Sequence, residues 1–403
     1  MWYIVCMKTQ KESISLQLQE IIHTYLGSAE DVLFFDIEST GLSPKNASVY
    51  LIGAACHTQE GWHLHQWFAQ DLSEEEAVLD AFLSFSKGFN RLVHFNGTTF
   101  DLPFLQTRCK KYGLSSPLSE MEQTDIYRRI SPCKNVLKLP NCKQKTLEEY
   151  LGNFRKDPFT GGELIELYKV YRTQQDDRLL KALLLHNADD IRGMLSILPV
   201  LSYPALFSGG IKKAEAEVSP CTDYAGRPQK ELLLRLELTC PLAKPLTLHA
   251  DGCYFSGKGG QGLLKVPVFC GELKHYYPDY KNYSYLPDED NAIHKSVAVY
   301  VDKTHRVPAT PETCYTRKTG EFLPLPKLQA GGEAQEALFA PLFSKGAVKE
   351  RSGKAAAFAK SGKAAKASHP HKNNYFLLED AFLQDNSRLM AYACRLLSCM
   401  QKG

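Results

Sequence analysis

The chain has 403 residues, more than one average hydrophobic core accommodates, which predicts two domains. Its hydrophobic share of 44% and charged share of 23% are those of a soluble globular protein, and its net charge of +3 favours no class of partner. No apolar run approaches the roughly 18 residues of a membrane span, the opening residues lack the pattern of a signal peptide, and the 12 cysteines contain no Cys-x-x-Cys pair. We therefore expect a cytoplasmic protein with reduced thiols, no membrane contact and no zinc ribbon.

Strands and helices are predicted to alternate through the N-terminal half, after a helical lead-in over residues 1–27. The apolar run 32–38 has the character of a buried strand. Strands followed by strand–helix alternation indicate an α/β fold, with a mixed sheet flanked by helices. Further strands are expected at 49–56, 61–68, 91–95 and 124–127, and helices at 74–86, 101–112, 146–151, 162–173 and 177–201.

The C-terminal half differs in composition. Apolar runs at 231–238, 263–269 and 296–301 indicate strands, and the stretch after them is rich in Ala, Gly and Lys. We expect a linker at 204–228, a β-rich region at 229–326, a mobile basic segment at 327–374 and a C-terminal helix at 375–403.

The basic charge is concentrated in that segment. Residues 344–372 hold eight Lys or Arg against one Glu, which leaves 40 of the 48 basic and 44 of the 45 acidic residues in the rest of the chain. The segment is either a solubilising linker or a source of non-specific phosphate contacts. The tyrosine-rich stretch 276–285 is either a stacking surface for single strands or part of a β core.

Two carboxylates lie two residues apart in the first predicted strand. The alternation of side chains places Asp36 and Glu38 on the same face of the sheet. Two such groups near a core repel each other, and burial raises their pKa values unless a cation compensates. The pair therefore either holds cations or is solvated at the end of the strand.

Two further carboxylates lie at positions where a site can form. Asp101 follows a predicted strand and begins the next helix, so it either caps that helix or points over the edge of the sheet. Asp190 lies four residues after His186, which places both on one helix face, whereas Asp189 points about 100° away. His186 and Asp190 form either an ordinary ion pair or part of a site.

Three segments together resemble the motifs of the DEDD 3′–5′ exonuclease superfamily, which has a ribonuclease H-like fold. Residues 35–42 (FDIESTGL) look like its first motif, and residues 96–103 (NGTTFDLP) look like its second. Residues 186–190 (HNADD) lie where its third motif is expected. The resemblance covers residues 28–203 and is similar in detail to YprB-type ribonuclease H-like domains.

The resemblance implies a metal-dependent nuclease that hydrolyses phosphodiesters at a 3′ end of DNA or RNA. Asp36, Glu38, Asp101 and Asp190 would hold two divalent cations, Mg²⁺ or Mn²⁺, for a two-metal reaction. Phe100 is either stacked on a base or part of the core. The residues that would contact the substrate are Thr40, Gly41, Leu42, Asn96 and Phe100.

One position departs from the pattern of the superfamily. Its histidine subclass places a histidine five residues before the last aspartate, and its tyrosine subclass places a tyrosine four residues before, whereas here His186 lies four residues before Asp190. Either His186 acts as the catalytic base in the tyrosine's place, or the site lacks a standard base. Two other functions stay open: a nuclease-like module that binds nucleic acid without cutting it, and an endo- or structure-specific ribonuclease.

Overall fold

The computed structural model describes residues 7–15, 19–154, 159, 161–222, 225–327, 337–345 and 374–402. The chain divides into two compact units, Met1–Leu206 with Cys240–Pro245 and Phe207–Thr239 with Leu246–Gly403. The predicted mobile basic segment lies outside the described residues, except at 327, 337–345 and 374. None of the described helices is long and apolar enough to cross a membrane.

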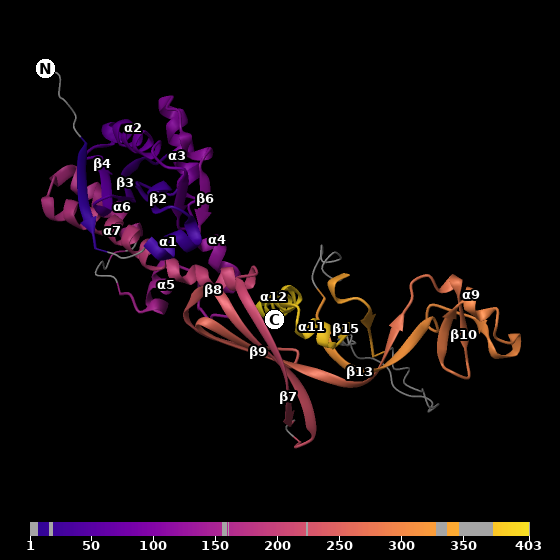
Figure 1. The fold of residues 1–403 in the computed structure, drawn as a ribbon. Coiled ribbons are helices and arrows are strands. Elements are labelled where there is room, and N and C mark those ends of the chain that lie inside the picture. Colours follow the sequence, from indigo (N-terminus) through magenta and orange to yellow (C-terminus); the bar gives the residue numbers. More distant parts are fainter. Residues whose placement is uncertain are drawn as a thin grey trace, which may run out of the picture. The chain divides into compact units, whose positions relative to one another are not determined.

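The first unit is built on a six-stranded sheet with the order β1-β4-β3-β2-β5-β6 (Figure 1). Its strands are β1 (Lys8–Ile14), β2 (Val32–Ser39), β3 (Val49–Thr58), β4 (Gly61–Phe68), β5 (Arg91–His94) and β6 (Glu122–Asp125). The helices up to residue 207 are α1 (Gln19–Leu26), α2 (Glu75–Ser86), α3 (Asp101–Tyr112), α4 (Ile126–Ile130), α5 (Gln144–Leu151), α6 (Gly161–Gln174), α7 (Asp177–Ser196) and α8 (Ser202–Phe207).

Helices cover both faces of this sheet. Successive side chains of β2 point to opposite faces and meet a helix on each side. Phe35 points to one face and packs against Phe82 of α2, with ring centroids 5.6 Å apart. Asp36 points to the other face, where Asn187 of α7 contacts it. Strand β2 runs antiparallel to β3 and parallel to β5. The predicted α/β class, a mixed sheet flanked by helices, is confirmed.

The helical lead-in predicted over residues 1–27 is wrong for residues 8–14, which form the edge strand β1. This strand pairs antiparallel with β4, from Lys8 opposite Phe68 to Ile14 opposite Trp62, and its side chains are almost all exposed. Backbone hydrogen bonds rather than a buried face hold it, so apolar spacing gave no signal for it. Helix α1 confirms the second part of the lead-in.

The strands after residue 207 form two sheets, ordered β14-β15-β13-β9-β8-β7 and β11-β10-β12. The predicted β-rich region is confirmed, and the exact domain boundaries stay predictions. The strands are β7 (Ile211–Thr222), β8 (Pro228–Ala250), β9 (Cys253–Tyr276), β10 (Tyr283–Leu286), β11 (Asn291–His294), β12 (Val307–Pro308), β13 (Tyr315–Leu325), β14 (Leu342–Phe343) and β15 (Asn374–Leu377); the helices are α9 (Lys295–Ala298), α11 (Asp380–Leu383) and α12 (Asn386–Lys402).

Two predictions of secondary structure beyond residue 203 were wrong because apolar spacing was a poor guide. The predicted linker 204–228 contains β7, which pairs along β8 although only two of its side chains are buried. The predicted strand 296–301 begins as helix α9, and its Val297, Val299 and Tyr300 are exposed, so they mark no buried strand face.

Two further predictions concern the second unit. The predicted C-terminal helix begins later than expected, because residues 374–377 form β15 beside β13. In the stretch 276–285, several tyrosines pack around a small core of Ala292, Ala309 and Cys314, which favours the β-core interpretation. These are Tyr277, Tyr280, Tyr283 and Tyr285.

Candidate active site

Strand β2 and helix α7 bring three of the predicted site residues together. His186 Nε2 lies 3.1 Å from Asp190 Oδ2 and 3.7 Å from Glu38 Oε1. One potential ligand atom of each residue lies within 4.8 Å of the other two. The spacing of four residues on α7 therefore places both side chains against β2, as the helix geometry predicts.

Asp36 is oriented by a buried amide network that the sequence analysis missed. Asn187 Nδ2 donates to Asp36 Oδ2 at 3.2 Å, and Gln66 Nε2 of β4 donates to Asn187 Oδ1 at 2.9 Å. Asn187 also lies against Gly53 of β3, where an added Cβ would be 2.0 Å from its Oδ1. The only sequence signal for Asn187 was its place inside the third motif, beside His186.

A second close approach holds α7 from the side of α5. Gln144 Nε2 donates to the backbone oxygen of Asp190 at 2.8 Å and to Glu148 Oε1 at 2.9 Å. At Gly193 an added Cβ would lie 2.0 Å from Glu148 Oε1, so α5 and α7 touch at a glycine. The helix that carries His186, Asn187 and Asp190 is thus seated by two glycine contacts.

Asp101 reaches the same place from helix α3. Its Oδ1 accepts a hydrogen bond from the backbone N–H of Ile37, which lies between the two β2 carboxylates, at 3.4 Å. The N-cap of α3 is Phe100 and makes no side-chain capping bond, so the capping alternative for Asp101 is wrong. The structure therefore brings all four predicted carboxylates together, from β2, α3 and α7.

The carboxylates perturb one another strongly. Burial, followed by the negative charges of Asp190, Asp101 and Glu38, raises the pKa of Asp36 well above its usual value. Burial is also the main cause that raises the pKa of Asp101 to about 7, despite hydrogen bonds from backbone N–H groups. A buried set of hard oxygen donors with such mutual repulsion fits a divalent cation, which would relieve it.

These raised pKa values predict that the metal-free protein becomes less stable as the pH rises. Asp101 titrates near 4 when unfolded and at about 7 when folded, so the folded state holds more protons between these values. The stabilisation is present below that window and is lost as pH rises through it. We expect the melting temperature in EDTA to fall by several degrees from about pH 5 to about pH 8, and Mn²⁺ to restore it. A melting temperature that rises over this range would contradict the prediction.

The close contact at Gly53 predicts that Gly53→Ala impairs activity without touching a carboxylate. The new Cβ would displace Asn187 and with it the hydrogen bond to Asp36. We expect the predicted nuclease activity to fall about 10- to 100-fold, the effect common when a residue that orients a metal ligand is lost. Gly162→Ala is the control, because an added Cβ there meets no atom within 4 Å. Equal activity of the two variants would refute this role.

The loop after β2 is built around Thr40, one of the predicted substrate residues. Thr40 Oγ1 accepts a hydrogen bond from Ser48 N, and Thr40 N donates to Ser48 O, both at 2.9 Å. An added Cβ at Gly41 would lie 3.4 Å from Ala47 Cβ, so the two sides of the loop are in close contact at this point. Leu42 is 82% exposed. Thr40 and Gly41 thus shape the loop, and Leu42 presents its side chain at the surface.

A buried ion pair ties this loop to the helices on the opposite face. Arg108 of α3 donates from Nε to Glu75 Oε1 at 2.7 Å, from Nη1 to Pro44 O and from Nη2 to Ser48 Oγ, both at 3.1 Å. Glu75 of α2 is fully buried and also accepts from Val49 N at 2.8 Å. The sequence gave no signal for this pair, because its residues are 33 positions apart.

The remaining predicted substrate residues lie around the turn before α3. Asn96 has a φ of 62°, and its N–H donates to Asp125 Oδ1 at 3.0 Å. Thr98 N donates to Asp125 Oδ2 at 3.4 Å, so this buried carboxylate at the end of β6 holds the turn. Phe100 packs on the core of the unit, with its ring 5.5 Å from that of Phe104, which favours the core alternative.

A family comparison agrees with this architecture. The family model of the RNase_H superfamily matches residues 33–202, which include all four carboxylates and His186. Residues 33–202 form a ribonuclease H-like domain. The resemblance to this fold is thereby confirmed.

Three solved structures are distantly similar to the chain. The chain is similar to the family B DNA polymerase from the hyperthermophilic archaeon Pyrobaculum calidifontis, with 16% identity and a TM-score of 0.34 over 62% of this chain and 35% of that one. Two structures of Exonuclease I follow, both with a TM-score of 0.26 over 51% of this chain: an apo form (13% identity, 56% of that chain) and E. coli Exonuclease I in complex with a dT13 oligonucleotide (14% identity, 54% of that chain). The chain spans about a third to just over half of these proteins, and TM-scores this low carry no conclusion about its activity. No curated protein matches the sequence.

Proposed function

We propose that the ribonuclease H-like domain is a metal-dependent 3′–5′ exonuclease of the DEDD type, acting on DNA or RNA. The observation that carries the proposal is the convergence of Asp36, Glu38, Asp101 and Asp190 from β2, α3 and α7 on one place. Such a cluster of negative charge is unfavourable in a folded protein unless cations offset it. Membership of the domain in a nuclease superfamily supports the same function.

The four carboxylates would hold the cations, and their hard oxygen atoms suit Mg²⁺ or Mn²⁺. When bound, two such cations activate the attacking water and stabilise the leaving oxygen. Asn187 keeps Asp36 in place through its amide hydrogen bond, and the backbone of Ile37 keeps Asp101 in place. Leu42, exposed on the loop braced by Arg108, would contact the terminal nucleotide.

The proposal is tested with single-stranded DNA and RNA carrying a 5′ label, in the presence of Mn²⁺. A 3′–5′ exonuclease shortens these substrates stepwise and releases nucleoside monophosphates, but it leaves a circular single strand intact. Cleavage of the circle would identify an endonuclease instead. If no substrate is cut and calorimetry detects no binding of Mn²⁺, the proposed function is wrong.

His186 is proposed to accept the proton of the attacking water, in the place of the tyrosine that one subclass uses. Its Nε2 faces Asp190 and Glu38, so it lies beside the groups that would hold the cations. The same geometry also suits a second role, direct ligation of a metal, since one potential ligand atom of each of the three lies within 4.8 Å of the others.

The variant His186→Gln separates the two roles. Loss of a general base is expected to lower kcat about 10²- to 10⁴-fold while leaving the affinity for Mn²⁺ unchanged. Loss of a ligand would weaken Mn²⁺ binding in calorimetry, and excess metal would then restore part of the rate. Full turnover together with unchanged Mn²⁺ binding would exclude both roles. His57→Gln, whose ring lies against Trp62, is the matched control.

A further inference from the structure

A pocket of about 320 Å³ lies at the three-stranded sheet of the second unit. Its lining combines three cationic side chains, Lys295, Lys303 and Arg306, with apolar side chains of the same stretch. The apolar ones are Val299, Val307 and Pro308, and no acidic residue lines the pocket. The pocket therefore joins positive charge to an apolar surface.

No ion pair neutralises the three cations of this pocket within the described part of the chain. None of its three cations lies within ion-pair distance of a described carboxylate, although Arg306 Nη1 donates to the backbone oxygen of Ala298. Acidic residues of the same stretch have other partners. Asp288 pairs with His305, and Asp290 accepts from two tyrosines. Hydrogen bonds from Thr304, followed by the charges of His305 and Arg306, lower the pKa of Asp302, which lies too far from Arg306 for an ion pair. An anionic ligand would therefore meet unpaired cations.

The apolar surface around this pocket is unusually exposed. Val297, Val299, Tyr300 and Val307 are 56%, 62%, 89% and 46% exposed, and they are four of the ten large hydrophobic side chains that are exposed in the described part of the chain. Val299 and Val307 line the pocket, and Val297 and Tyr300 lie within two residues of Val299 in the chain. Exposed apolar side chains in a pocket commonly mark a surface that binds a partner. The ligand that fits both properties has anionic groups next to flat apolar ones.

We propose that this pocket binds single-stranded nucleic acid, with phosphates at the three cations and a base against Val299 and Val307. Single strands carry their charge on the backbone and leave base faces free for apolar contact, which is the combination that the pocket complements. The assignment rests on the proposed nuclease function, and it adds a second contact with the substrate in the other unit of the chain.

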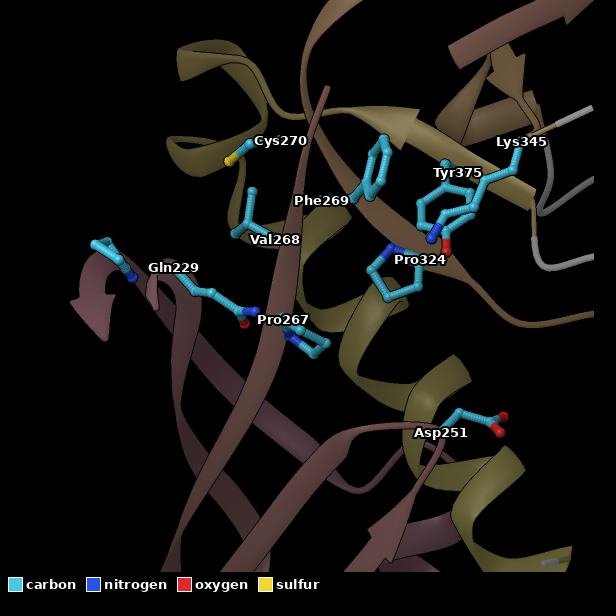
Figure 2. A pocket seen from close by; sticks show the side chains of 10 residues that line it. Gln229, Asp251, Pro267, Val268, Phe269, Cys270, Pro324, Lys345 and Tyr375 are labelled. Carbon is cyan, nitrogen blue, oxygen red and sulfur yellow. The ribbon is translucent and has the colours of Figure 1, made fainter. Parts of the chain in front are cut away.

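Two other pockets differ in the feature that matters here. The pocket beside Phe269 and Tyr375 has a single cation, Lys345, whose ammonium lies 4.4 Å and 5.5 Å from the centroids of these two rings, and Asp251 also lines it (Figure 2). A pocket of about 560 Å³ in the first unit is lined by three acidic side chains and Arg192, which pairs with two of them. The first pocket thus has one cation and one carboxyl, and the cation of the second is already paired, so neither gathers several unpaired cations for a polyanion.

The test measures binding of a fluorescent oligo-dT to the full chain in EDTA, where no cleavage interferes. The triple variant Lys295→Gln/Lys303→Gln/Arg306→Gln is expected to bind about 10-fold more weakly or worse, and to reduce the slope of log Kd against log salt concentration by about 2. The control is Lys212→Gln/Lys213→Gln/Lys230→Gln, which removes the same charge from lysines already paired with Glu237, Glu215 and Glu321. It should bind within about twofold of the wild type once the weak long-range effect of charge is screened.

The apolar half of the site is tested by Val307→Ser at an exposed position, which leaves the charge of the pocket unchanged and is expected to weaken binding as well. Equal affinities of the pocket variant and the lysine control would overturn the proposal. The proposal would also be overturned if the triple pocket variant lost binding to poly-glutamate but kept its affinity for oligo-dT, because the pocket would then fit an acidic protein. Failure of the nuclease proposal has a different signature, because oligo-dT would then bind in EDTA but stay uncut in Mn²⁺.

Discussion

Replacing Asp36 with Asn is expected to reduce hydrolysis by about 10³-fold or more, the order of effect seen when one preorganised electrostatic group is removed. Burial, followed by the charges of Asp190, Asp101 and Glu38, raises the pKa of Asp36, so this carboxyl interacts with the three others. The amide has nearly the same shape but no charge to offer a cation. Initial rates on oligonucleotides in Mn²⁺ measure the effect.

The same substitution is expected to stabilise the metal-free protein, because it removes one of four mutually repelling charges. The gain should be largest at high pH, where the carboxyl of the wild type is ionised, and should vanish in saturating Mn²⁺. Asp189→Asn is the control, because Asp189 lies next to Asp190 in helix α7 but pairs with Arg192. If Asp189→Asn loses as much activity as Asp36→Asn, the site has been assigned to the wrong residues.

Arg108→Leu is expected to destabilise the ribonuclease H-like domain by about 3–5 kcal/mol, since it leaves the fully buried Glu75 without its cation. Burial alone would raise the pKa of Glu75, but hydrogen bonds from Arg108, Val49 and Tyr112 hold it below its usual value. Without Arg108 the carboxylate loses its main compensating partner. Thermal unfolding should shift by roughly 10 °C.

Two further variants distinguish the buried pair from ordinary surface pairing. The double variant Arg108→Leu/Glu75→Leu should recover most of the lost stability, because no uncompensated charge remains. Arg172→Leu breaks the exposed pair with Asp71 and should cost less than about 1 kcal/mol. If Arg108→Leu lowers the stability as little as Arg172→Leu does, the buried pair does not stabilise the domain. An increased KM of Arg108→Leu at a temperature where it is folded would connect it to the 43–48 loop.

Most parts of the site that the sequence predicted are fixed by local periodicity, and Asp101 was predicted from its place between a strand and a helix. Alternation along a strand was enough to place Asp36 and Glu38 on one face, and the helical repeat was enough to place His186 beside Asp190. The α/β class followed from the same two periods. The catalytic and metal-binding roles of these residues stay predictions that the experiments above address.

The parts that the sequence did not predict depend on partners far away in the chain. Asn187 contacts Gln66 and Asp36, which are 121 and 151 residues away, and no local pattern reports such contacts. The predictions for strand β1 and for the exposed stretch after α9 failed for a different reason. In β1 backbone pairing acts without apolar side chains, and after α9 apolar side chains occur without burial.

In the proposed function, helix α7 carries the proton acceptor His186, the metal ligand Asp190 and Asn187, whose amide orients Asp36, so that all three would move with the helix as one body. Its position is fixed where glycines at 53 and 193 let β3 and α5 approach. A small slide of α7 would therefore remove cation affinity and proton transfer together, before any strand separates. Heat inactivation should thus precede global melting, and the gap between the two temperatures would measure how firmly this one helix is seated.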